Sequence, residues 1–104
     1  MKYIKKYESI NIGTPKKGDY VICEESNLNL PTEFRSFISN NIGQLNNIDE
    51  YSNVYKVHYD NIPIEFINRF DDDSEREMFL KEIKNWSEDK HDLETIFSVK
   101  KYNL

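Results

Sequence analysis

The chain has 104 residues, of which 38% are hydrophobic and 32% are charged, with a formal net charge of −5. This length suits a single domain (1–104) with one modest core, and the abundance of Ile, Phe and Tyr excludes a disordered chain. The single cysteine, Cys23, excludes an internal disulfide. No apolar run approaches the roughly 20 residues of a membrane span, so we expect a cytoplasmic protein.

Charge is distributed unevenly along the chain. Residues 1–20 carry five lysines and two acids, a net charge of +3, whereas residues 24–82 carry thirteen acids and five bases, a net charge of −8. An acidic body with a basic N-terminal arm (1–14) disfavours general binding to DNA or RNA, because such binding requires Lys and Arg to displace counterions. It favours docking on a basic surface of another protein.

The first half of the chain predicts strands and a short helix. A turn at Gly18 leads into an alternating strand at 20–23. A helix capped by Thr32 is predicted near 32–39, with its apolar residues spaced for one buried face. A second strand is predicted at 42–48, with Gly43 as a bend or a site of close approach. The strand at 54–60 has the clearest alternation.

The second half is less regular. Because Pro63 cannot donate a backbone hydrogen bond to a neighbouring strand, residues 62–70 are predicted to form an edge strand or a loop. Residues 75–86 fit either a helical face or a short last strand followed by a helical turn, and we adopt the strand because a barrel requires one there. Ser87 is the expected N-cap of a C-terminal helix near 88–101.

Several segments together resemble a known type of domain. The sequences KKGDYVIC, NIGQLNNI and VYKVHYD resemble the first three strands of an SH3-like small β-barrel of the KOW or Tudor type, and FLKEIKNWS resembles its last strand running into a helical turn. The resemblance covers residues 16–86 and implies a mainly β (α+β) fold, a five-stranded barrel with a helical insert near 32–39 and a C-terminal helix near 88–101. Such domains bind RNA, methylated or proline-rich peptides and other proteins, so the resemblance selects no function.

An acidic turn is the first candidate binding site. The residues predicted to contact a protein partner there are Asp71, Asp72, Asp73 and Glu75. Counted from Asp71, oxygen-bearing side chains at positions 1, 3, 5 and 12 partly mimic a calcium-binding EF-hand loop. Arg76 stands at the sixth position, where that loop requires glycine, so we interpret the segment as a solvated turn. No metal and no cofactor are predicted.

Aromatic rings are a second candidate. Tyr51, Tyr55, Tyr59 and Trp86 are predicted to line a ligand groove, which suits prolyl or methylated cationic ligands. The alternative is that these rings pack in the core, as aromatic residues on alternating strands usually do, with Tyr51 in a loop as the exception.

Lysines near the N-terminus are a third candidate. Lys5, Lys6, Lys16 and Lys17, interleaved with tyrosines along the arm, are the predicted contacts if the chain binds nucleic acid. The alternative is that they protect a strand edge from unwanted pairing.

No catalytic residue is predicted, because His58 and His91 fall on different elements without partners at metal or triad spacing. The leading hypothesis is a non-catalytic protein-binding module. Its narrower form is a phage- or virus-encoded accessory protein that modulates or inhibits a host factor such as a nucleic-acid-binding defence enzyme. The composition suggests this origin, since alanine is absent while Asn and Ile each occur twelve times, as in AT-rich genomes. The alternatives are a nucleic-acid-binding SH3-like domain that uses the basic arm, and an enzyme whose site is assembled from distant residues.

Overall fold

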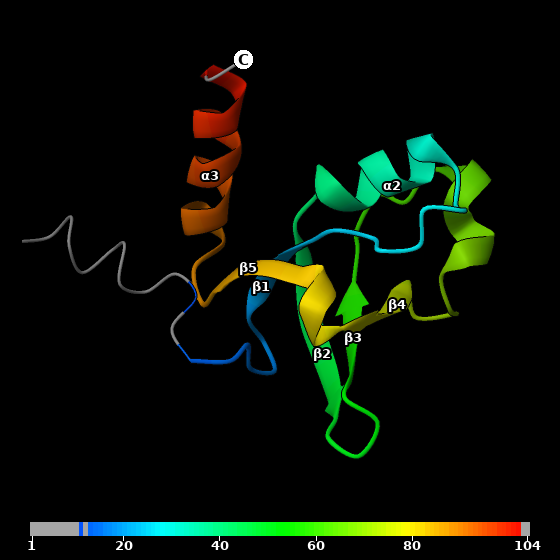
Figure 1. The fold of residues 1–104 in the computed structure, drawn as a ribbon, viewed down its shortest axis with the longest axis horizontal. Helices are drawn as coiled ribbons and strands as arrows, with labels where there is room; N and C mark the ends of the chain where they lie inside the picture. Colours follow the sequence, from blue (N-terminus) through cyan, green and yellow to red (C-terminus); the bar gives the residue numbers. More distant parts are fainter. Residues whose placement is uncertain (1–10, 12, 103–104) are drawn as a thin grey trace, which may run out of the picture.

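A computed structural model describes residues 11 and 13–102 and shows an antiparallel sheet flanked by helices (Figure 1). The five strands are β1 (Tyr20–Cys23), β2 (Gly43–Asp49), β3 (Val54–His58), β4 (Glu75–Phe79) and β5 (Ile83–Ser87). The helices are α2 (Thr32–Ser39), the 3-10 helices η1 (Ile64–Arg69) and η2 (Leu80–Glu82), and α3 (Lys90–Tyr102). The strand order is β4-β3-β2-β1-β5, so β5 returns to the outer side of β1.

Most elements lie where the sequence predicts them. The predicted strands at 20–23, 42–48 and 54–60 correspond to β1, β2 and β3. The helix predicted near 32–39 is α2, and the C-terminal helix is α3. Thr32 is not the cap of α2 as predicted: it is the first helical residue, Pro31 occupies the N-cap position, and no side chain caps the helix. The mixed α+β class is confirmed. Closure into a barrel is not, because β4 and β5 are the two edges of an open sheet in the described part of the chain.

Residues 62–70 form a 3-10 helix instead of the predicted edge strand or loop. Pro63 immediately precedes the first turn of η1, where its fixed φ and missing N–H are compatible with a helix start. The helix packs on α2 through aromatic rings: the Phe66 and Phe70 ring centroids lie 5.5 and 6.0 Å from that of Phe34. Packing of these half-buried rings on Phe34 of α2 explains why the segment does not join the sheet.

The segment 75–86 contains parts of two strands where the sequence predicted one strand and a helical turn. The turn is η2, and the fifth strand, β5, follows it and pairs with β1. Hydrogen bonds to Glu82 hold the connection between β4 and β5 in place. One carboxylate oxygen of Glu82 accepts a hydrogen bond from the Phe79 N–H at 2.9 Å, and the other accepts bonds from the Ser26 N–H at 2.9 Å and hydroxyl at 2.6 Å.

The start of α3 differs slightly from the prediction. Asp89, not Ser87, caps the helix, because its Oδ1 accepts a hydrogen bond from the His91 N–H at 2.9 Å. Ser87 is buried at the end of β5, where its hydroxyl donates to Asp92 Oδ2 at 2.8 Å. This contact joins β5 to the first turn of α3.

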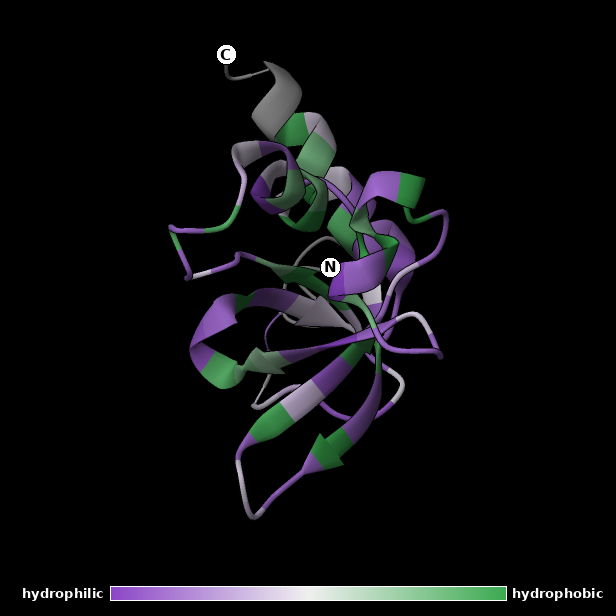
Figure 2. Ribbon diagram, turned by 90° about the vertical axis from the view of Figure 1, so that its right-hand side faces the viewer, coloured by the Kyte–Doolittle hydropathy of each residue, from purple (hydrophilic) through white to green (hydrophobic). Residues whose placement is uncertain are grey.

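The core lies between the inner face of the sheet, α2 and η1. Figure 2 shows hydrophobic and hydrophilic residues alternating along the β2–β3 hairpin, as expected for strands with one buried face. The buried cluster consists of Val21, Cys23, Phe34, Ile38, Leu45, Val57, Tyr59, Met78 and Ile83. The close approach predicted at Gly43 is confirmed, since an added Cβ would collide with the Val57 side chain and lie 3.1 Å from the Tyr59 ring.

Each edge of the sheet is partly occupied by groups of the same chain. At β5, the Asn11 N–H donates to the Trp86 carbonyl at 2.9 Å, and the Trp86 N–H donates to Asn11 Oδ1 at 2.8 Å. At β4, the Glu75 N–H donates to Asp71 Oδ1 and the Phe79 N–H donates to Glu82 Oε1, both at 2.9 Å. Occupied edges discourage pairing with strands of other chains.

Candidate functional site

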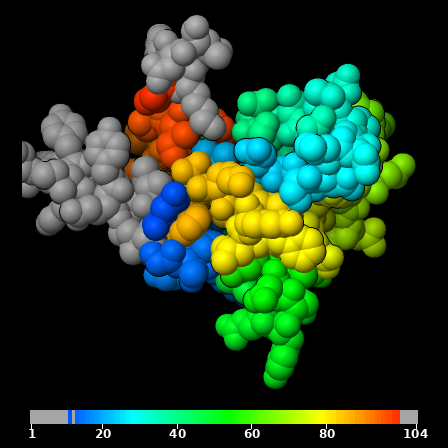
Figure 3. Space-filling model, viewed as in Figure 1, coloured from blue at the N-terminus to red at the C-terminus, as the bar shows by residue number. Residues whose placement is uncertain are grey.

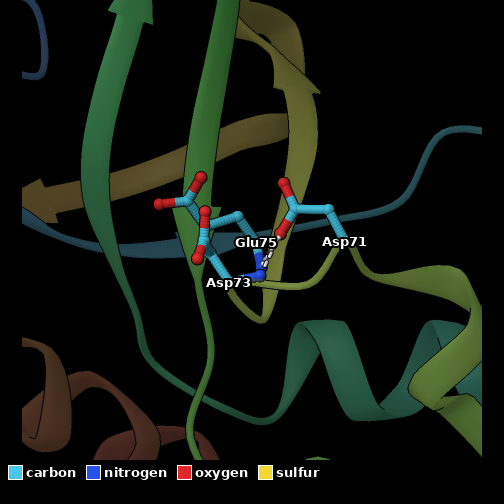
Figure 4. Close-up of side chains that lie close together, drawn as sticks. All are labelled: Asp71, Asp73 and Glu75. Atoms are coloured by element: carbon cyan, nitrogen blue, oxygen red, sulfur yellow. Dashed lines mark hydrogen bonds between the residues drawn. The ribbon is translucent and has the colours of Figure 1, made fainter.

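The acidic turn before β4 is held in a defined shape by its own carboxylates. Asp71 Oδ1 accepts hydrogen bonds from the N–H groups of Asp73 and Glu75, each at 2.9 Å, and Ser74 adopts a positive φ of 59°. Figure 4 shows the carboxylates of Asp73 and Glu75 close together, with Asp71 turned towards the backbone. Carboxylate oxygens of the three residues lie within 4.8 Å of one another. The turn therefore concentrates negative charge at the surface.

The segment that partly resembles an EF-hand loop in sequence does not have the conformation of such a loop in the structure. Residues 75–79 form β4, so the segment that would be the loop is a turn followed by a strand. Met78 is in the core, and Glu82, at the twelfth position, is buried at the opposite end of β4 beside Ser26. The interpretation as an acidic turn fits this geometry.

His58 connects β3 to the acidic turn. Its Nδ1 lies 2.9 Å from the Asp73 carbonyl oxygen, and its Nε2 lies 2.9 Å from Asp60 Oδ1. Both partners are acceptors, so both contacts become hydrogen bonds only when the ring is doubly protonated. The hydrogen bond with the Asp60 carboxylate is the main cause that raises the pKa of His58 above its usual value of 6.5.

A buried ionic group lies beneath the turn. Arg76 donates hydrogen bonds to Glu25 Oε2 from Nη2 at 2.8 Å and from Nε at 3.0 Å, and to the Arg69 carbonyl at 2.9 Å. The Arg76 and Arg69 guanidinium carbons lie 4.8 and 5.3 Å from the centre of the Phe34 ring. Side-chain exposure is only 6% for Glu25 and 20% for Arg76. The Glu25 and Arg76 charges therefore compensate each other inside the protein and offer little surface to a partner.

Sequence reasoning missed this ionic group, although a local signal was present. Glu25 follows Val21 and Cys23 in the inward phase of β1, and Arg76 shares its phase on β4 with the buried Met78. A charged residue at an inward position of a strand indicates a buried charge that needs a partner.

The predicted aromatic residues occupy different environments. Tyr59 is 1% exposed and lies in the core, Tyr55 and Trp86 pack against the core from the side, and Tyr51 is fully exposed at the tip of the β2–β3 hairpin. Because Tyr59 is almost entirely buried, the four rings do not line one groove in this conformation.

The predicted basic residues are described only in part. Lys16 and Lys17 are exposed in the turn before β1, where the Lys16 N–H donates to Asp19 Oδ2 at 2.9 Å and Gly18 adopts a φ of 96°. Lys5 and Lys6, like the rest of 1–10, lie outside the described residues.

Cys23 is the residue with the most nucleophilic side-chain type, but its environment opposes reactivity. It is buried in β1, and burial raises the pKa of its thiol to about 12. The thiolate is the reactive form, so this cysteine is inert near neutral pH.

Folding exposes the acids of 24–82 more than the bases. Of the thirteen acids, ten are exposed, Glu75 is half-buried, and Glu25 and Glu82 are buried. Of the five bases, only Lys81 is exposed, and the others are half-buried: Arg35, Lys56, Arg69 and Arg76. The surface of this region is therefore more acidic than its composition indicates.

Comparison of the chain with protein-family models, with curated proteins and with solved structures finds no match. Among the described residues, no helix has the length and apolar character that crossing a membrane requires.

Proposed function

We propose that this protein is a small non-catalytic binding module whose acidic surface docks on a basic surface of another protein. The observation that carries the proposal is the separation of charge in residues 24–82, where ten of thirteen acids are exposed and four of five bases are half-buried. A surface of one sign attracts a partner of the opposite sign, accelerates association and disfavours partners of like charge.

We further propose that the sheet is an open version of the SH3-like arrangement. The order β4-β3-β2-β1-β5, with β5 returning to β1, supports this, as does the helical turn η2 between β4 and β5. In the narrower form of the proposal, the protein is a phage or viral accessory protein. Its carboxylates would occupy a basic groove of a host factor that otherwise binds nucleic acid.

Affinity purification from host lysate, with and without nuclease, tests the proposal. Asp72→Lys combined with Asp73→Lys reverses two exposed charges without removing the Asp71 carboxylate that shapes the turn. We expect a partner that survives nuclease treatment and binds the double variant about tenfold more weakly at low salt. Glu88→Lys, an exposed acid beyond β5, is the matched control and should bind normally.

Two results would refute the proposal. One is recovery of nucleic acid alone, with a steep dependence of binding on salt, which would favour the basic arm instead. The other is a protein partner that binds the double variant and the wild type equally well.

A further inference from the structure

The 3-10 helix η1 presents two large apolar side chains to solvent. Ile64 is 84% exposed and Ile67 is 52% exposed. A 3-10 helix has three residues per turn, so side chains three positions apart lie on the same side. The two isoleucines therefore form one apolar stripe. Figure 3 shows the yellow-green segment that contains η1 at the right-hand margin of the molecule, beside α2.

The opposite side of η1 already makes the contacts that hold the helix in place. The Phe66 ring lies 5.5 Å from that of Phe34, and the Arg69 guanidinium lies 5.3 Å from the same ring. Because Phe66 and Arg69 attach η1 to α2, the outward isoleucines are not required for this packing. Isoleucine is among the residues most often buried, and a contiguous apolar patch at a surface, larger than singly scattered apolar side chains, marks interaction sites.

The charge around the stripe is negative. Exposed acids precede it, lie within it and follow it: Asp60, Glu65, Asp71, Asp72 and Asp73. Arg69 is the only base in 60–75, and its guanidinium faces Phe34. Along the chain, the two exposed isoleucines therefore lie in a segment whose exposed charged side chains are all carboxylates.

We propose that Ile64 and Ile67, together with these exposed acids, form a docking surface for a basic segment of a partner protein. The segment carries at least one apolar residue that covers the isoleucines and lysines or arginines that pair with the acids. We call this set of residues the η1 surface. The inference rests on the proposed protein-binding function and specifies where binding occurs and what is bound.

The sheet edges favour side-chain recognition over strand addition. Asn11 covers Trp86 on β5, and Asp71 and Glu82 occupy the N–H groups at both ends of β4. A partner that added a strand would have to displace these groups first. Contact through the η1 surface requires no such displacement.

A library of displayed random 12-residue peptides, selected on the full immobilised chain, tests the inference. We expect the enriched peptides to combine Lys or Arg with apolar residues. One enriched peptide, synthesised with a fluorescent label, should bind Ile64→Ser/Ile67→Ser at least tenfold more weakly than the wild type in an anisotropy titration. Val99→Ser, which removes an apolar side chain 53% exposed on α3, is the matched control and should bind normally.

A second variant keeps the test decisive if the serine substitutions disturb folding. Glu65→Lys/Asp72→Lys leaves both isoleucines in place and reverses two exposed charges. We expect it to weaken binding of the same peptide, with the difference from wild type shrinking as salt is added. Circular dichroism should show that both double variants are folded.

Several results would overturn the inference. Equal binding of the peptide to wild type and Ile64→Ser/Ile67→Ser would refute the η1 surface as the binding site. It would not refute the proposed protein-binding function, because the lysate experiment tests that function separately. Enrichment of acidic or uncharged peptides would refute the predicted basic partner. Self-association of the wild type that is lost in the serine variant would show that a second copy covers the stripe. Absence of any enriched peptide would also count against the surface.

Discussion

The charged groups inside this protein are paired with one another, whereas the exposed acids on its surface share one sign. Inside, Glu25 and Arg76 form a pair with 6% and 20% side-chain exposure, and the neighbouring Glu82 accepts three hydrogen bonds. Outside, the acids of 60–73 are exposed and share one sign. Buried charges must be compensated because water does not reach them, whereas exposed charges are solvated and need no partner.

This difference separates residues that maintain the fold from residues that are free to bind. Changes to the interior charges should alter stability, and changes to the exterior charges should alter association. The following predictions test that division, from the largest expected effect on stability to the smallest.

Arg76→Met should have the largest effect, because it leaves the Glu25 carboxylate buried without its partner. We expect the free energy of unfolding to fall by about 3–5 kcal/mol, measured by urea denaturation. The double variant Glu25→Leu/Arg76→Met, which removes both charges, should recover most of this loss. A single variant as stable as the wild type would show that the ion pair does not support the fold.

Glu82→Gln should have the next largest effect. The substitution removes the charge that receives hydrogen bonds from Phe79 and Ser26, and we expect a loss of about 1–3 kcal/mol. Those bonds lower the pKa of Glu82 below its usual 4.5 despite burial. The stabilisation is thus present above pH 4.5 and is lost as the pH falls through the folded-state pKa.

This prediction is checked by measuring the urea midpoint of the wild type and of Glu82→Gln as a function of pH. The wild type should lose stability on acidification more steeply than Glu82→Gln, so the two curves should converge at low pH. Parallel curves would exclude Glu82 as a source of acid sensitivity.

His58→Asn should have a smaller effect that runs in the opposite direction with pH. Because the folded-state pKa is raised, the contribution of His58 is fully present below pH 6.5 and is lost as the pH rises through the folded-state value. We expect the thermal midpoint of the wild type, relative to that of the variant, to decrease between acidic and mildly alkaline pH. A constant difference would mean that His58 does not change its charge on folding.

Asp72→Asn should have the smallest effect on stability, within about 0.5 kcal/mol of the wild type, because Asp72 is exposed. Urea denaturation measures this, and the same variant should weaken partner binding. A destabilisation as large as that of Glu82→Gln would remove the distinction between interior and exterior charges.

The parts of the fold that the sequence predicted are those with local signals. Alternation identified β1 and β3, and the spacing of Phe34, Phe37 and Ile38 identified α2. The division of 75–86 between β4 and β5 was missed because the run from Glu75 to Trp86 contains neither glycine nor proline to mark the end of the first strand.

The ionic group inside the protein was missed for a different reason. Glu25 and Arg76 are 51 residues apart, and Ser26 and Glu82 are 56 apart, so no local pattern connects them. The stripe on η1 was missed because Pro63 and the neighbouring isoleucines favour a strand or loop, and packing of Phe66 on α2 outweighs that preference.

Asn11 sets a limit on how far the N-terminus can be shortened. Its backbone and side chain occupy the N–H and carbonyl groups of Trp86 on β5. Proteolysis beyond Asn11 would remove these two hydrogen bonds from the β5 edge, and a less occupied strand edge pairs more readily with a strand of another chain. Loss of this one residue should therefore make pairing between copies of the protein through β5 easier.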